Sequence, residues 1–240
     1  MHLVIGTPCY GGMMCTEYTQ SLLALKDAMQ QYGHQVTVIF LGNESLIQRG
    51  RNTIAHHFLQ TDASHLLFID ADQRFRANDI AEMIRADKGI IGGPVPMKGI
   101  NWERVRQGAV LNHPNLAALT GIFNLNELEG HEMVSPDEPF QVEHIGTGFM
   151  LIRRDVFEQL APYTETYTNG GASIAPDDEV HNFFAVGVED GKLLSEDYHF
   201  CHEYRKHGGT VWAAPWCELG HFGAYCFSGT YAAMESHTRH

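Results

Sequence analysis

The first hundred residues alternate short β-type runs with helical patterns, and this alternation limits the possible folds more than any other feature. Apolar strands that are separated by helices build a sheet with helices covering it. We expect strands at residues 3–6, 36–41, 65–70 and 89–93, and helices at residues 16–32, 45–59 and 78–87. This succession predicts a nucleotide-binding α/β half over about residues 1–100.

The remaining residues, about 101–240, are less regular. We expect residues 141–153 to form one strand broken by Gly146 and Gly148, followed by a short helix at 154–160. Asp190 and Gly191 predict a hairpin turn between strands at 182–188 and 192–194. Ser195 is expected to cap a helix that reaches residue 207, and a last strand is expected at 210–214. No linker is evident, so the sequence predicts a single α/β domain over residues 1–240, with a central, mostly parallel mixed sheet flanked by helices.

Composition excludes several classes of function. The 16 Lys and Arg residues against 29 Asp and Glu residues give a formal net charge of -13, which argues against nonspecific nucleic-acid binding. The five cysteines are odd in number and form no C-x-x-C pair, which indicates free thiols in a reducing compartment. No apolar stretch approaches the roughly 20 residues of a membrane span, and no secretory signal is evident. We therefore expect a cytoplasmic protein without a transmembrane segment.

The most informative local signal is residues 65–72, in which an apolar run leads into Asp70, Ala71 and Asp72. The two carboxylates then emerge at the carboxyl end of a buried strand, where open α/β sheets bind ligands. Paired carboxylates repel each other and are tolerated when a divalent cation lies between them and a diphosphate, and oxygen ligands suit Mg²⁺ or Mn²⁺. A D-x-D pair also occurs at ordinary solvated turns, so the motif alone leaves both interpretations open.

A second acidic pair, Glu196 and Asp197, follows Ser195. In the first turn of a helix the dipole stabilises negative charge, and a positioned, ionised carboxylate can act as a general base toward a hydroxyl. Acidic residues are favoured in any first helical turn, so a purely structural role remains the alternative.

Further polar residues could complete a site. His221 lies between two glycines in flexible backbone, from which its imidazole could reach a metal at Asp72. Single histidines are more often structural. Arg49, Arg51 and Asn52 in the second helix and Lys98 after the fourth strand are candidate phosphate donors, although surface arginines are usually only solvated.

Together these motifs resemble the GT-A glycosyltransferases, a metal-dependent class that uses nucleotide sugars. The resemblance covers nearly the whole chain in sequence order. It consists of the loop Gly6-Thr7-Pro8-Cys9-Tyr10, then Arg51-Asn52, Phe68-Ile69-Asp70-Ala71-Asp72, the stretch Gly146-Thr147-Gly148 through Arg154, Ser195-Glu196-Asp197, and finally His221. It implies a single GT-A (Rossmann-like) domain and, from the E-D motif of the inverting, family-2-like members, inversion at the anomeric carbon.

The resemblance also implies a role for each residue. The expected metal ligands for Mn²⁺ or Mg²⁺ are Asp72 and His221, with Asp70 contacting the ribose or the metal through water. The nucleotide would be bound by Thr7, Pro8, Tyr10, Arg51, Asn52, Asp70 and Ala71. The donor sugar and acceptor would lie near Lys98, Trp102, Gly146, Thr147 and Gly148. Asp197 would be the catalytic base, with Glu196 as the second candidate.

The implied donor is a nucleoside-diphosphate sugar, with UDP as the leading expectation. The first loop lacks the acid that contacts uracil in the commonest inverting subfamily, so the base is left open. The implied acceptor is a glycan or a lipid-linked hydroxyl.

Three other functions share some of these features. A sugar nucleotidyltransferase shares the sheet and the metal, but it usually carries a basic, Gly-rich loop near the first strand, and residues 11–14 contain no Lys or Arg. A noncatalytic nucleotide-sugar-binding module would keep the fold without turnover, and the presence of both acidic pairs argues against it. A metal-dependent hydrolase is disfavoured because the sequence has no H-E-x-x-H motif.

Overall fold

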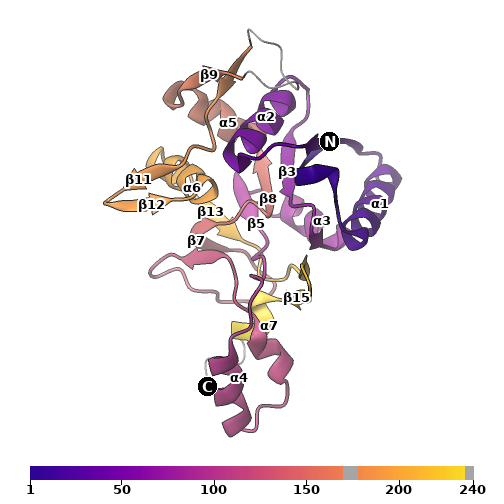
Figure 1. Cartoon of the computed structure of the whole chain (residues 1–240), viewed down its shortest axis with the longest axis vertical. Coiled ribbons are helices and arrows are strands. Elements are labelled where there is room, and N and C mark those ends of the chain that lie inside the picture. The colour runs from indigo at the N-terminus through magenta and orange to yellow at the C-terminus, as the bar shows by residue number, and fades with distance from the viewer. Residues whose placement is uncertain (170–177, 236–240) are drawn as a thin grey trace.

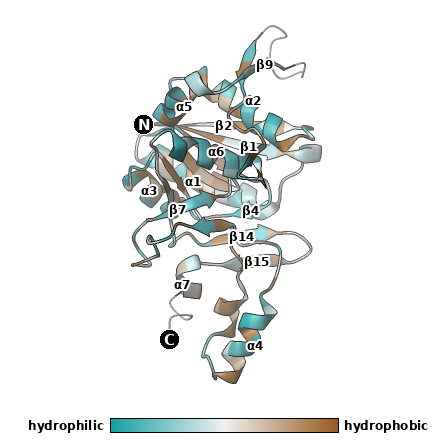
Figure 2. Cartoon of the chain, turned by 90° about the vertical axis from the view of Figure 1, so that its left-hand side faces the viewer, coloured by the Kyte–Doolittle hydropathy of each residue, from teal (hydrophilic) through white to brown (hydrophobic). Residues whose placement is uncertain are grey.

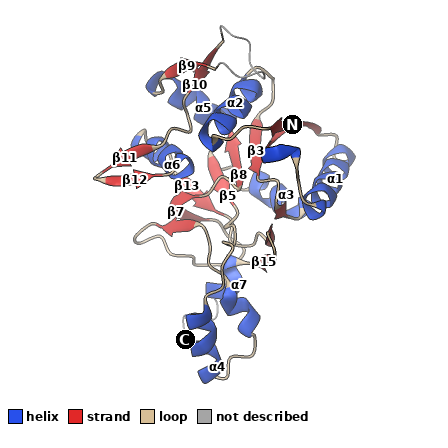
Figure 3. Cartoon of the chain, in the orientation of Figure 1, coloured by secondary structure: helices blue, strands red, loops and turns tan. Residues whose placement is uncertain are grey.

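The computed structural model describes residues 1–169 and 178–235, and its centre is an eight-stranded mixed sheet (Figure 3). The strands are β1 (His2–Cys9), β2 (Gln35–Gly42), β3 (His65–Ile69), β5 (Ile90–Gly92), β6 (Leu125–Glu127), β7 (Phe140–Ile145), β8 (Phe149–Arg153) and β13 (Val211–Ala213), in the order β2-β1-β3-β8-β5-β13-β7-β6. β1, β2, β3, β5 and β13 run in one direction, whereas β7 and β8 run against them. The predicted α/β class, with a mostly parallel mixed sheet flanked by helices, is confirmed.

Helices cover both faces of the sheet because successive side chains of a strand point to opposite faces. Leu3, Ile5 and Leu67 pack with α1 (Thr16–Gln31) and α3 (Ala77–Arg85) on one face. Val4 and Phe68 pack with α2 (Ile47–Leu59), α5 (Arg154–Leu160) and α6 (Glu196–Lys206) on the other face. Figure 2 shows hydrophobic residues in the central strands and both hydrophobic and hydrophilic residues on the helices. Every helix within the described ranges is too short or too polar to span a lipid bilayer.

The strand predicted at residues 141–153 is wrong, because the structure divides this segment into two separate strands. β7 pairs with β13 and β6, whereas β8 lies between β3 and β5. Gly146, Thr147 and Gly148 connect β7 to β8. The glycines therefore lie where the chain passes from one position in the sheet to another. The sequence predicts only an interruption within one strand.

The hairpin predicted around Asp190 and Gly191 is confirmed, with φ values of 48° and 75° at these two residues. It joins β11 (Gly187–Glu189) to β12 (Lys192–Leu194). The strand predicted to begin at residue 182 is wrong in its first half, since Phe183 and Phe184 belong to a loop. Both rings are buried in the core, and a short buried apolar run is easily mistaken for a strand.

Ser195 precedes α6 as predicted, but its side chain does not cap the helix. Its hydroxyl donates a hydrogen bond to the carboxylate of Asp197 instead. Each of the five cysteines, all of which lie within the described ranges, is free, as expected. Cys15 caps α1 by accepting a hydrogen bond from the backbone N–H of Tyr18 at 3.3 Å.

The remaining elements were not predicted. α4 (Trp102–Val110) and α7 (Tyr231–Glu235) occupy the lower part of Figure 1, away from the other helices. β9 (Thr166–Thr168) pairs with β10 (Glu179–His181), and short 3-10 helices occur at Tyr10–Gly12, Leu116–Thr120 and Ala161–Tyr163. A small antiparallel sheet has the order β15 (Cys226–Gly229), β14 (Leu219–Phe222) and β4 (Gln73–Arg74). This sheet joins the C-terminal part of the chain to the segment that follows β3.

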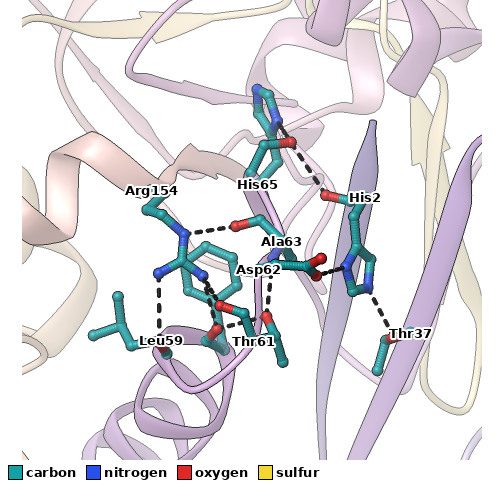
Figure 4. A network of polar contacts seen from close by, with 10 residues as sticks. His2, Thr37, Leu59, Thr61, Asp62, Ala63, His65 and Arg154 are labelled. Atoms are coloured by element: carbon teal, nitrogen blue, oxygen red, sulfur yellow. Dashed lines mark hydrogen bonds and ion pairs between the residues drawn. The ribbon is translucent and has the colours of Figure 1, made fainter.

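A network of polar contacts holds the amino-terminal ends of β1 and β3 (Figure 4). His2 contacts Asp62 through Nδ1 at 2.7 Å and Thr37 through Nε2 at 2.9 Å. Arg154 donates to four backbone carbonyls of residues 58–63 and lies over the ring of Phe58, 4.7 Å from its centroid. These contacts fix the end of the sheet opposite to Asp70.

Candidate functional site

A cleft of about 510 Å³ lies at the carboxyl ends of the parallel strands β1 and β3. The N–H of Cys15 donates to the carbonyl of Ala71 at 2.9 Å, so the loop after β3 is fixed to the start of α1. Six residues that were predicted to bind the nucleotide or metal line this cleft: Pro8, Tyr10, Arg51, Asp70, Ala71 and Asp72. The other lining residues are Met13, Met14, Cys15, Glu44, Ser45 and Ile47.

His221 reaches Asp72 because β14 pairs with β4. The register places His221 opposite Gln73, and the N–H of Phe222 donates to the carbonyl of Asp72 at 2.8 Å. His221 Nε2 then lies 3.3 Å from Asp72 Oδ2. Asp72 and His221, which lie far apart in the sequence, therefore meet as predicted.

Lys98 also contacts Asp72, with Nζ 2.6 Å from Oδ2. Burial raises the pKa of Asp72, but hydrogen bonds from His221 and Lys98 outweigh that effect and hold the pKa below its ordinary value. Asp72 is therefore ionised near neutral pH and can ligate a cation.

The residues around Asp72 fit a divalent cation. His221 Nδ1 donates to the carbonyl of Pro96 at 2.8 Å, which orients the ring with Nε2 toward Asp72. A carboxylate oxygen and an imidazole nitrogen are ligands that Mn²⁺ accepts. The carboxylate of Asp70 points instead to Arg51, so a cation at Asp72 and His221 would need further oxygen ligands, such as those of a diphosphate or water.

Arg51 links the two acidic motifs. Its Nη2 donates to Asp70 Oδ1 at 3.2 Å, and its Nε donates to Glu196 Oε1, also at 3.2 Å. The Arg51 side chain is only 4% exposed, and its guanidinium lies 5.5 Å from the centroid of the Phe68 ring. Arg51 Nη1 is buried and has no hydrogen-bond partner among residues 1–169 and 178–235. Arg51 lines the cleft, and its Nη1 is a donor that the described residues leave without an acceptor.

The segment between β7 and β8 touches both acidic motifs. A methyl group in place of the Gly148 hydrogen would lie 3.1 Å from Asp70 Oδ2, and one at Gly146 would lie 3.4 Å from Asp197 Oδ2. The Gly148 carbonyl also accepts the N–H of Asp70 at 3.0 Å. Thr147 between them is fully buried, and its hydroxyl has no partner within the described part of the chain. This segment therefore packs between the end of β3 and the start of α6.

The Asp197 carboxylate is held through one oxygen. Oδ1 accepts hydrogen bonds from the Ser195 hydroxyl and from the N–H of Tyr198, the latter at 2.9 Å. Oδ2 faces Gly146. This arrangement orients the carboxylate and commits only one of its two oxygens to these contacts.

Three residues next to Asp197 were not predicted. Burial and the negative charge of Asp197 raise the pKa of Tyr198 to about 12, so its phenol stays protonated and donates to Asn124 Oδ1 at 2.6 Å. The ring of His144 stacks on Tyr198 with centroids 5.0 Å apart. No motif includes Asn124 or His144, and only the tertiary structure brings them to the start of α6.

Other predicted residues have different surroundings. The Thr7 hydroxyl is buried against the hydroxyl of Tyr18 at 2.6 Å. The Asn52 amide donates to Asn182 and accepts from the N–H of Phe184, so it holds the loop between β10 and β11. Trp102 is 69% exposed at the start of α4. None of Thr7, Asn52 and Trp102 lines the cleft described above.

Comparisons with known proteins identify similar structures. No protein-family model matches this sequence, and comparison with curated proteins gave no significant match. The crystal structure of A197 from STIV is similar with a TM-score of 0.51 and 14% identity, covering 93% of this chain and 86% of that chain. GalNAc-T7, solved with UDP, GalNAc and Mn²⁺, gives a TM-score of 0.49 at 11% identity, covering 92% of this chain and 43% of that chain. S. aureus TarS gives a TM-score of 0.44 at 13% identity, covering 89% of this chain and 35% of that chain. This chain thus spans less than half the length of the last two, and the likeness to A197 shows a shared fold.

Proposed function

We propose that this protein is a glycosyltransferase that transfers a sugar from a nucleoside-diphosphate sugar, UDP being the expected nucleotide, to a hydroxyl of a glycan or lipid-linked acceptor. The observation that supports this proposal is the convergence of the two acidic motifs through Arg51, which donates to both Asp70 and Glu196. A transferase of this kind needs a cation-binding acid and a base in one site, because leaving group and nucleophile act on the same carbon.

The cleft supplies contacts for the nucleoside diphosphate. Pro8 and the exposed ring of Tyr10 would pack against the base, as aromatic and apolar surfaces of ligand sites do. The unused Nη1 of Arg51 would donate to a ribose or phosphate oxygen. The Lys98 ammonium, held at Asp72, would add positive charge near the diphosphate.

Asp72 and His221 would hold Mn²⁺ or Mg²⁺. When bound, the cation would offset the negative charge that develops on the departing nucleoside diphosphate, an effect of several kcal/mol. His221 is oriented for this role by its hydrogen bond to Pro96, and Asp72 stays ionised because His221 and Lys98 lower its pKa.

Asp197 would act as the base. Its Oδ1 is committed to Ser195 and Tyr198, so Oδ2 would accept the proton of the acceptor hydroxyl. The acceptor oxygen forms the new bond to the anomeric carbon while the bond from that carbon to the diphosphate oxygen breaks. A single displacement of this kind inverts the anomeric centre. Glu196 would be the less suitable base because it is paired with the buried Arg51.

Ligand-induced stabilisation tests the nucleotide and metal parts of the proposal. UDP, GDP and dTDP are added with and without Mn²⁺, and the midpoint of thermal unfolding is measured, because a ligand that binds the folded state raises it. We expect one nucleotide to stabilise the protein, more strongly with Mn²⁺, and Asp72→Asn to lose the Mn²⁺-dependent part. Asp27→Asn, on the exposed side of α1, is the matched control and should behave as the wild type. If no nucleotide shifts the midpoint in either condition, the proposal is wrong.

Measurements of turnover distinguish the role of the base from the roles of the nucleotide-binding residues. UDP release from a panel of UDP-sugars identifies the donor, and Asp197→Asn should reduce turnover by about 10²–10⁴-fold while leaving the nucleotide-dependent shift unchanged. Full activity of this variant would exclude Asp197 as the base. Release of pyrophosphate from a nucleoside triphosphate and a sugar phosphate would indicate a nucleotidyltransferase instead. Binding of a UDP-sugar without any turnover would indicate a noncatalytic module.

A further inference from the structure

A second group of metal-ligand side chains lies outside the cleft, between the β11–β12 hairpin and α6. One ligand atom from each of Glu189, His199 and Glu203 lies within 4.8 Å of the other two, the one such group of three within the described ranges. His199 Nε2 is 3.8 Å from Glu189 Oε1, and His202 Nε2 is 3.5 Å from Glu189 Oε2. One imidazole and two carboxylates therefore converge at this point, and His202 contacts the other oxygen of Glu189.

Local geometry explains the convergence. His199, His202 and Glu203 are three and four residues apart, so they share one face of α6. Glu189 ends β11 directly before the tight turn at Asp190, and the hairpin lies beside α6 (Figure 1). The ring of His199 packs directly on Gly187, where a methyl group would lie 2.2 Å from it. Only glycine leaves room for the ring in this orientation.

The spacing of these atoms suits a zinc ion. Zn²⁺ binds imidazole nitrogen and carboxylate oxygen at about 2.0–2.2 Å in tetrahedral sites, which places neighbouring ligand atoms about 3.4 Å apart. The separation of 3.8 Å between His199 Nε2 and Glu189 Oε1 is close to this value. All four side chains are partly buried, with exposed fractions of 16% for His199, 29% for His202, 33% for Glu189 and 21% for Glu203. They are thus partly shielded from water but open to an entering ion.

Two further observations bear on the site. His199 Nδ1 is buried and has no hydrogen-bond partner in the described part of the chain, so the present contacts do not satisfy the ring. Glu203 also accepts a hydrogen bond from Lys206 at 2.8 Å and lies 3.6 Å from His207. Lys206 is 54% exposed and can move into solvent when an ion takes its place.

We propose that Glu189, His199 and Glu203 form a structural Zn²⁺ site, with water as the fourth ligand, separate from the pair Asp72 and His221. An ion here would tie the β11–β12 hairpin to α6. The same helix begins with Glu196 and Asp197, so the ion would also hold the start of α6 in place relative to the hairpin. The proposal does not depend on the transferase activity.

Zinc binding by the chelator-treated, dialysed full chain tests this proposal, with ZnCl₂ alone as the probe in calorimetric titration. The variant Asp72→Asn/His221→Gln removes the first pair and should still bind one equivalent of Zn²⁺. Addition of Glu189→Gln or His199→Gln should weaken that binding at least tenfold. His131→Gln, an exposed histidine outside the group, is the matched control and should leave it unchanged.

Cobalt substitution and unfolding provide independent measurements. Bound Co²⁺ should give the visible absorption of tetrahedral coordination, and Glu189→Gln should abolish it while far-ultraviolet circular dichroism shows an intact fold. Zn²⁺ should raise the midpoint of thermal unfolding of the wild type but not that of Glu189→Gln. The proposal is overturned if Asp72→Asn/His221→Gln binds no Zn²⁺, or if the combined loss of Glu189 and His199 leaves its affinity unchanged.

Discussion

Replacement of Arg51 by Met should destabilise the protein strongly, because Arg51 is the one positive charge that contacts both Asp70 and Glu196 in the described structure. Breaking a buried ion pair costs about 3–5 kcal/mol, since the remaining charge is left uncompensated. The Glu196 side chain is 12% exposed, so its pair with Arg51 counts as a buried ion pair. The Asp70 side chain is 35% exposed, so its carboxylate is hydrated more easily once Arg51 is removed. We therefore expect Arg51→Met to lower the free energy of unfolding by about 3 kcal/mol.

Urea unfolding at pH 7 measures this loss. The matched control is Arg49→Met, two residues earlier in α2, whose side chain is 41% exposed and pairs with Glu44. A pair of this exposure contributes about 0–1 kcal/mol, so the two variants should differ by about 2 kcal/mol or more. Arg51→Met/Glu196→Gln should recover part of the stability, because the uncompensated charge is removed together with its partner. A loss for Arg51→Met no larger than for Arg49→Met would refute the reasoning.

Three further predictions concern other parts of the molecule. Arg154→Ala should lower the free energy of unfolding by about 2 kcal/mol in urea titrations, because several backbone carbonyls lose their donor. Arg153 is 32% exposed and pairs with exposed carboxylates, so Arg153→Ala should cost less than about 1 kcal/mol, and equal losses would contradict this. Burial lowers the pKa of His144 below the value of about 6.5 expected when unfolded, so the unfolded chain binds more protons and stability should fall from pH 7 to pH 5. His144→Phe should make the free energy of unfolding less dependent on pH over this window, and an unchanged pH dependence would exclude the contribution. Lys98→Gln frees the Asp72 carboxylate and should tighten Mn²⁺ binding several-fold in calorimetry without nucleotide, whereas weaker binding would indicate that Lys98 does not compete with the ion.

Apart from β4 and the 3-10 helix Tyr10–Gly12, the strands and helices of the first 93 residues could be predicted because their signals are local. Each apolar run or helical period lies within a few residues, and the glycine after α1 ends that helix. The end of β3 could also be predicted, since the apolar run stops at the acidic pair. For this reason the sequence predicts Asp70 and Asp72 together at the ligand-binding edge of the sheet.

The pairing of distant segments could not be predicted from local signals. Gly146 and Gly148 predict an interrupted strand. The sequence contains no local pattern that places β8 between β3 and β5. β4 has two residues, so the sheet that carries His221 to Asp72 has no recognisable pattern. Arg51 was proposed as a phosphate ligand, but its bond to Glu196, 145 residues away, depends on how α2 and α6 pack on the same face.

The position of β8 has a consequence for how the chain folds. β3 and β5 do not pair with each other, and each contacts β8 as its neighbour. A ribosome that has released only the first half of the protein has therefore exposed two apolar strand edges whose partner has not yet been synthesised. Such edges are sites of aggregation, and pairing across a long sequence separation slows folding. We expect the isolated segment 1–100 to be insoluble. The central sheet should form only after β8 has paired with β3 and β5.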